Sequence, residues 1–298
     1  MMPMLHSSMA VALPEPITPY FLLMGVLIPS AVALLMLLIG RRLGGMSAWV
    51  PALAIAAGIL LGFVVAMPHK PLPALRLSGL RPGSDWTYCL VYPLALLGLL
   101  DALTKVSLWV RLIGSLAVAW GVVLLIAGGR LSYGMMALLA GAIWALTIST
   151  EALATRRRGA LAPLVLWAVT SASSAVVMMS NSADGGRIAL LLAGVLGAAV
   201  LTAWIFREIR FARGVSIQIV PLIAALLLST DLYALDNFLW PNAALLAAGL
   251  ATAWVGELPP LRSTISLAAT MIPLAIVGAR AAAEFQRAQQ SQSADEAL

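Results

Sequence analysis

Residues 20–40 read YFLLMGVLIPSAVALLMLLIG, and two arginines, Arg41 and Arg42, follow directly. No side chain in this stretch is charged. An α-helix rises 1.5 Å per residue, so about 20 apolar residues cross the hydrocarbon core of a bilayer. The run is continuous rather than alternating, which favours a helix over a strand of a membrane barrel. The segment therefore predicts a membrane-spanning helix that ends at a basic flank.

The whole chain shares this apolar character. Of its 298 residues, 62% are hydrophobic and 10% are charged, and its mean hydropathy is +1.00. Soluble domains contain about 45–50% apolar and about 25% charged residues. This chain has too few polar residues to cover a water-exposed surface. The composition predicts an all-α fold, a polytopic bundle of transmembrane helices in one domain over residues 19–283.

The same length criterion predicts ten spans. They are 19–40, 47–67, 86–103, 107–128, 131–150, 160–180, 188–206, 215–235, 238–256 and 263–283. If the short turn at Thr104–Val106 does not form, the count is nine. We expect residues 1–18 to be an extracytoplasmic segment, 68–85 an external loop, and 284–298 a polar, disordered tail.

Lysine and arginine favour cytoplasmic loops. The connections after odd-numbered spans hold 11 of these residues and the other connections and tail hold 7, which predicts an extracytoplasmic N-terminus. Arginine supplies 16 of the 18 basic residues, which hints at a bacterial inner-membrane protein. The two densest basic clusters suit the anionic headgroups of the bilayer rather than nucleic acid. They comprise Arg156, Arg157, Arg158, Arg207, Arg210 and Arg213.

Ten spans can divide into two inverted repeats of five, as in many transporters. The third predicted span contains Pro93 and reaches Asp101, and the eighth contains Pro221 and reaches Asp231. The proline-to-aspartate spacings differ, being eight and ten residues. An internal duplication is thus a hypothesis that the sequence supports only through this shared pattern.

Two carboxylates near the end of the eighth span are candidates for substrate or ion binding, since ionisable groups in a membrane are costly. Asp231 and Asp236 lie five residues apart, so a continuous helix separates them by about 140° around its axis. A break in the helix could bring both to one cavity. The alternative is that they cap the helix end and face water.

Three further residues are binding candidates. Gln218 lies close to Pro221, where a freed backbone carbonyl could accompany a ligand, although an interhelical hydrogen bond also accounts for a buried glutamine. Arg111 can extend to the headgroups or pair with Asp101, for which Lys105 competes. The small polar residues of the sixth span either allow close helix packing or line a polar pathway. These are Thr170, Ser171, Ser173 and Ser174.

Motifs of catalysis and metal binding do not occur. The sequence has no HExxH, Walker or GxSxG pattern. Its two histidines, His6 and His69, lie outside the predicted spans, and a lone Cys89 cannot form an intrachain disulfide. We therefore expect no enzymatic activity, no cofactor and no metal.

Two functions remain open at this stage. The first is a secondary transporter or permease for a small molecule, and the second is a non-catalytic subunit or assembly factor with membrane-protein partners. Convergence of Asp231, Gln218 and the polar residues of the sixth span on one cavity would favour transport. A dry bundle would favour the subunit.

The predicted orientation can be tested by cysteine labelling. Single cysteines placed in the 68–85 loop of a chain lacking Cys89 should react with a membrane-impermeant thiol reagent in intact cells, because the loop is expected outside. Labelling only after permeabilisation would reverse the orientation.

Overall fold

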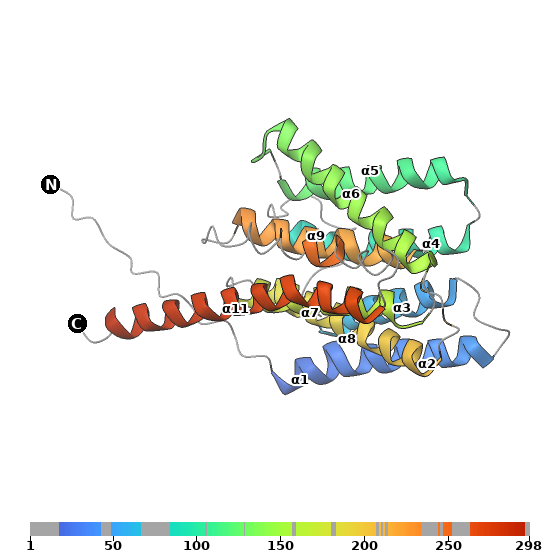
Figure 1. Cartoon of the computed structure of the whole chain (residues 1–298), viewed down its shortest axis with the longest axis horizontal. Helices are drawn as coiled ribbons and strands as arrows, with labels where there is room; N and C mark the ends of the chain where they lie inside the picture. The colour runs from blue at the N-terminus through green and yellow to red at the C-terminus, as the bar shows by residue number, and fades with distance from the viewer. Residues whose placement is uncertain are drawn as a thin grey trace.

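The computed structural model describes a helical protein (Figure 1). The described residues are 18–42, 49–66, 84–104, 106–127, 129–156, 159–179, 183–206, 209, 211, 214–233, 244, 247–251 and 263–295. Within these ranges the regular elements are all helices. They are α1 (Pro19–Phe21), a π-helical turn η1 (Leu22–Leu27), α2 (Ile28–Arg42), α3 (Trp49–Ala66), α4 (Ser84–Leu103), α5 (Leu108–Ala127), α6 (Tyr133–Arg156), α7 (Leu161–Met179), α8 (Ala183–Ile205), α9 (Val215–Tyr233) and α11 (Ser263–Asp295).

Several of these helices have the length and composition of membrane spans. Six are long and apolar enough to cross a bilayer, and three shorter apolar helices accompany them at 49–65, 87–103 and 268–280. Most of the predicted ninth span, 238–256, lies outside the described residues, of which 247–251 are helical. The all-α prediction is confirmed for the described residues, while the count of ten spans remains a prediction.

The first span is continuous although a proline interrupts its hydrogen bonding. It begins at Thr18, whose hydroxyl oxygen accepts a hydrogen bond from the N–H of Phe21 at 3.2 Å. Pro29 has no N–H to donate to the preceding turn. Just before it, the N–H of Ile28 reaches back five residues to the carbonyl of Leu23, which makes the turn π-helical. The apolar run 20–40 thus forms one helical path from Pro19 to Arg42.

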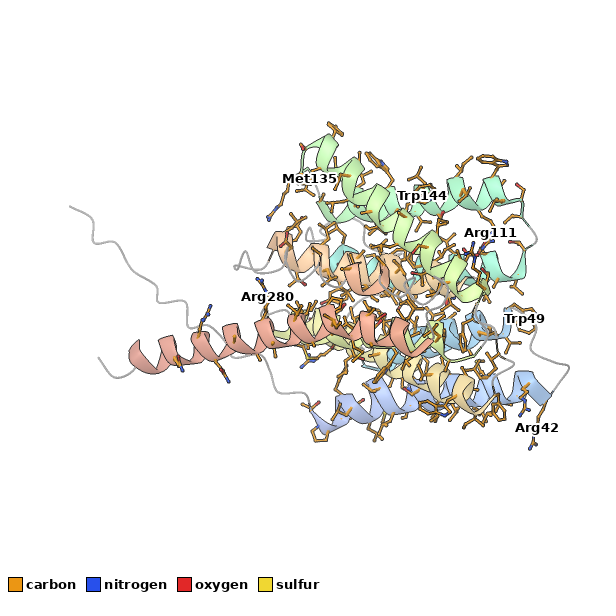
Figure 2. The ribbon with its side chains drawn as sticks, in the orientation of Figure 1. Arg42, Trp49, Arg111, Met135, Trp144 and Arg280 are labelled. Carbon is orange, nitrogen blue, oxygen red and sulfur yellow. The ribbon has the colours of Figure 1, made fainter. Side chains whose placement is uncertain are left out.

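Successive helices run in alternating directions. Figure 2 shows Arg42 and Trp49, on consecutive helices, at one end of the bundle, and Met135 and Arg280 towards the other. Helix α11 extends past the bundle (Figure 1), because its 33 residues measure about 50 Å whereas a bilayer core is about 30 Å thick. The chain from Glu284 to Asp295, for which we expected disorder, is helical in the structure.

Helix α9 lies at the centre of the bundle. It contacts α4, α5, α6 and α7, and most of its residues are buried. The hairpin of α5 and α6 lies to one side of it and α1–α2 to the other (Figure 1). One face of α5 is exposed, including Trp109 and Ile113, as expected of a helix that faces lipid on one side. The position of α9 therefore determines which helices can share a site.

The crossing of α4 and α9 is unusually close. A Cβ atom added to Gly98 would lie 2.3 Å from Cγ of Gln218 and 2.4 Å from the carbonyl oxygen of Gly214. Gly214 directly precedes α9 and has φ of 80°, a conformation that favours glycine. A Cβ there would lie 1.9 Å from the carbonyl oxygen of Gly98. Only glycine at both positions lets the two backbones meet.

The contacts give mixed support to an internal duplication. α4 and α9, which would be equivalent helices, do cross, and α2 packs on α3 as α7 packs on α8. However, α11 packs extensively on α7, and the described residues show no contact of that extent between the corresponding pair, α6 and α2. The duplication remains a hypothesis.

Replacing Gly98 with alanine should separate α4 from α9 and lower the free energy of unfolding by about 1–3 kcal/mol, the usual cost of overpacking. Thermal unfolding in detergent micelles measures the effect. Gly114→Ala and Gly121→Ala are matched controls on α5, because nothing lies within 4 Å of a Cβ at either position. A Gly98→Ala protein as stable as these two controls would contradict the close crossing.

Candidate functional site

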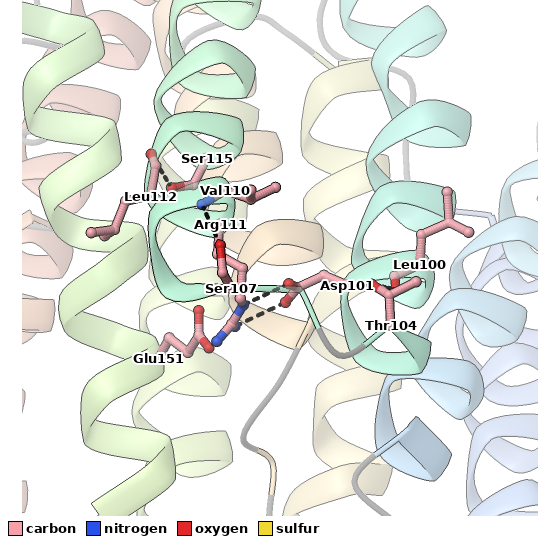
Figure 3. Close-up of polar contacts among 9 residues, drawn as sticks. All are labelled: Leu100, Asp101, Thr104, Ser107, Val110, Arg111, Leu112, Ser115 and Glu151. Carbon is pink, nitrogen blue, oxygen red and sulfur yellow. Dashed lines mark hydrogen bonds and ion pairs between the residues drawn. The ribbon is translucent and has the colours of Figure 1, made fainter.

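Three charged side chains from three helices meet at one end of α4, α5 and α6 (Figure 3). Nε of Arg111 donates a hydrogen bond to Oδ1 of Asp101 at 2.7 Å, and Nη2 donates to Oδ2 at 3.0 Å. Nη2 also donates to Oε1 of Glu151. The exposed fractions of the Arg111, Asp101 and Glu151 side chains are 14%, 9% and 11%. We call these three residues the ionic cluster.

Local hydrogen bonds explain why Asp101 and Arg111 meet. α4 ends where the Thr104 hydroxyl donates to the carbonyl of Leu100 at 2.7 Å. α5 begins at Ser107, whose hydroxyl oxygen accepts from the N–H of Val110 at 3.4 Å, the position of an N-cap. This short connection reverses the chain, so residues ten apart in sequence become neighbours. Thr104, Val106 and the cap residue Ser107 lie outside both helices, so α4 and α5 are separate, as the predicted count of ten spans requires.

The ionic cluster fastens the α5–α6 hairpin to α4. A bidentate arginine–carboxylate pair fixes the geometry of both partners more firmly than most other side-chain pairs do. Two roles were open for Arg111, extension to the headgroups and pairing with Asp101. The structure shows the pairing with Asp101. Glu151 was missed because the predicted fifth span ended at residue 150, whereas α6 continues to Arg156. Lys105 lies outside the described residues.

The second feature is a cavity of about 250 Å³ between α6, α7 and α9. Asp231 is its one charged lining residue among those described. The remaining lining residues are all apolar: Leu138, Leu139, Ala142, Ile143, Leu146, Val169, Val220, Ile223, Ala224, Leu227, Leu228, Ala244, Ala247 and Leu250. Asp231 is thus the candidate carboxylate that the structure places in a cavity.

Gln218 does not reach this cavity. It is 1% exposed, and its Nε2 donates to the carbonyls of Ala52 on α3 at 3.1 Å and Ala95 on α4 at 3.0 Å. Its Oε1 is buried and has no hydrogen-bond partner among the described residues, and the same holds for the hydroxyl of Ser216. Gln218 therefore serves the interhelical role that the sequence left open, joining α9 to two neighbours.

Three of the four polar candidates of α7 also form hydrogen bonds within the bundle. Thr170 and Ser173 donate to the carbonyls of Leu166 and Val169 one turn earlier, at 2.7 and 2.8 Å. Ser174 donates to the carbonyl of Gly186 on α8 at 3.0 Å. None of them is among the residues that line the cavity. The expected convergence of Asp231, Gln218 and these hydroxyls on one cavity is therefore not what the described residues show.

Some candidates cannot be placed. Asp236, Arg157, Arg158, Arg207, Arg210 and Arg213 lie outside the described residues. Arg156 ends α6 and is exposed, which suits the headgroup contact expected of it. In the described part of the chain, no three histidine, cysteine or carboxylate side chains gather as a metal site would require.

Comparison with known proteins gives no matching family model, no matching curated sequence and no matching solved structure.

Replacing Arg111 with methionine should destabilise the protein more than any other single change in the ionic cluster. The variant leaves two carboxylates close together in a poorly hydrated place, and removing one partner of a buried ion pair costs about 3–5 kcal/mol. Glu151→Gln is the control, because it preserves the bidentate pair of Arg111 and Asp101 and should lose much less. Equal thermal stability of the two variants in detergent would show that the cluster does not hold the hairpin.

Proposed function

We propose that the protein is a multi-pass membrane protein that transports a small molecule, which binds in the cavity between α6, α7 and α9. The observation that carries the proposal is an open-mouthed cavity between long apolar helices with a carboxylate in its wall. An ionisable residue within a membrane span is costly and marks a functional site by default. No catalytic arrangement is present among the described residues, so we propose a transporter rather than an enzyme.

The cavity extends from the middle of the helices towards the end of α9, where Asp231 lies two residues before Tyr233. Val169, Ile143 and Ile223 line it and lie near the middle of α7, α6 and α9, which span 161–179, 133–156 and 215–233. Substrate sites of secondary transporters lie near the bilayer midplane. A molecule bound against these three residues would lie near the middle of the helices, with Asp231 nearer to one end.

The α5–α6 hairpin is suited to be the moving part. At one end the ionic cluster attaches it to α4. At the other end Arg130 donates to the carbonyl of Leu232 at 2.7 Å, and the Tyr233 hydroxyl donates to the carbonyl of Ile126 at 3.0 Å. Between the two attachments α5 and α6 both contact α9, and α6 supplies apolar side chains to the cavity wall. Releasing one attachment at a time would open the cavity to one membrane face at a time.

The occupied Gln218 and α7 hydroxyls, which do not converge on the cavity, favour the subunit alternative. The carboxylate of Asp231 in the wall of an otherwise apolar cavity favours transport, and we give this observation the greater weight. We therefore favour transport. We retain from the sequence the extracytoplasmic N-terminus and a bacterial inner membrane as parts of the proposal.

Transport can be tested before the substrate is identified. In a Cys89→Ala background, a cysteine replacing Ala224 in the cavity wall should react with a membrane-impermeant thiol reagent in both right-side-out and inside-out vesicles. The reason is that a transporter exposes its site to each face in turn. Mass spectrometry of the labelled chain gives the extent of reaction.

A cysteine replacing Ala175, an exposed residue of α7, is the control and should stay unreactive in both preparations because it faces lipid. Reaction at position 224 from one face alone, or from neither, would contradict transport. Co-purification of other membrane proteins in fixed stoichiometry would instead establish the subunit function.

A further inference from the structure

The chemistry of the cavity wall restricts what can bind there. Among the described lining residues, Asp231 alone can form an ion pair or accept a strong hydrogen bond, and the other side chains are aliphatic. An anion would find no donor in this wall, and a sugar would leave most of its hydroxyls without partners. The occupant must therefore present an apolar surface to most of the cavity.

The carboxylate of Asp231 has no partner among the described residues. Arg130 approaches this end of α9, but its guanidinium bonds to the carbonyl of Leu232 and lies 4.1 Å from the centre of the Tyr233 ring. The Tyr233 hydroxyl donates its hydrogen bond to the carbonyl of Ile126. Asp231 is half-buried, and an ionised carboxylate beside apolar side chains has lost part of its hydration, which a proton or a cation can replace. The wall therefore favours a positively charged ligand.

We propose, on the basis of the transport function above, that the substrate is a small amphipathic cation, an apolar body bearing one amine or quaternary ammonium group, with Asp231 as its counter-ion. The ammonium group lies against Asp231, and the apolar body extends along α6 and α9 towards Leu146 and Val220.

The size and the mouth of the cavity agree with this class. A volume of about 250 Å³ is below the roughly 300–1,000 Å³ of pockets that hold drug-sized ligands. Leu138, Ala142 and Ala244 are lining residues that are also exposed, so they form the mouth. Because the mouth is apolar, the apolar body of an occupant can pass through it without leaving apolar surroundings. A compact molecule with one charged end is the best fit.

Binding of three probes that share an eight-carbon chain tests the proposal. The protein in lipid nanodiscs is equilibrated with octyltrimethylammonium, neutral 1-octanol or anionic octyl sulfate, and binding to empty nanodiscs is subtracted. We expect the cation to bind most tightly. Asp231→Asn should weaken its binding about tenfold or more, since a hydrogen bond or ion pair to a charged group is worth more than 1.4 kcal/mol. Octanol binding should not change.

Two further variants separate the charge from the cavity. Asp231→Glu keeps the carboxylate and should retain cation binding, which shows that any loss in Asp231→Asn is not a folding defect. Ala224→Phe fills the cavity and should abolish binding of cation and octanol alike, whereas Ala175→Phe, on the exposed face of α7, should change neither.

The outcomes distinguish this inference from the function on which it rests. If octanol binds as tightly as the cation and Asp231→Asn binds both normally, the cationic substrate is wrong, while the cavity remains a binding site. If no probe binds above the nanodisc background and Ala224→Phe has no effect, both the substrate class and the transport site are overturned.

Discussion

The close crossing of α4 and α9 is the contact on which the rest of the arrangement depends. Gly98 and Gly214 allow the two backbones to touch, and Gln218 then reaches carbonyls on both α3 and α4. Helices in a membrane gain little from hydrophobic association, so close backbone contact and interhelical hydrogen bonds hold them together. The crossing orients α9 so that its opposite end carries Asp231 into the cavity wall, and it fixes α4, which carries Asp101.

The α5–α6 hairpin is attached in a different way. It is joined to the bundle by charged and aromatic groups at its two ends, Arg111 at one and Arg130 at the other, and by apolar contacts between them. The Arg130 contact is exposed and can exchange partners with water, whereas the ionic cluster is poorly hydrated and must be released as a unit. Apolar contacts in the middle can slide without leaving a polar group unsatisfied. This division of contacts suits a hairpin that moves against a fixed core, which is how we understand the proposed transport.

The polar residues of the helices show why counting them in the sequence overstates the polarity of the interior. Thr147, Thr150, Thr170, Ser173 and Thr202 each donate to a carbonyl three or four residues back in their own helix. A hydroxyl satisfied in this way need not face a pathway. Asp231 differs because a carboxylate has no proton to donate to a helix carbonyl when it is ionised. Asp231 is therefore the residue whose side chain a bound ligand would stabilise.

The helical fold could be predicted from the sequence because it follows from local composition. Uncharged runs such as 20–40 have the length of a bilayer crossing, and in hydrocarbon only a helix satisfies their backbone groups. Asp101, Arg111, Gln218 and Asp231 could be singled out for the same reason, since each is costly in an apolar run. The pairing of Arg111 with Asp101 is one of the two roles that the sequence offers, because the two residues lie ten apart. The contact of Arg111 with Glu151 and the partners of Gln218 could not be predicted, because they depend on how helices distant in sequence cross. Only the tertiary structure brings Arg111 to Glu151 across 40 residues of sequence. It likewise decides that Gln218 forms hydrogen bonds with two other helices, and that Asp231 lies in the wall of an apolar cavity.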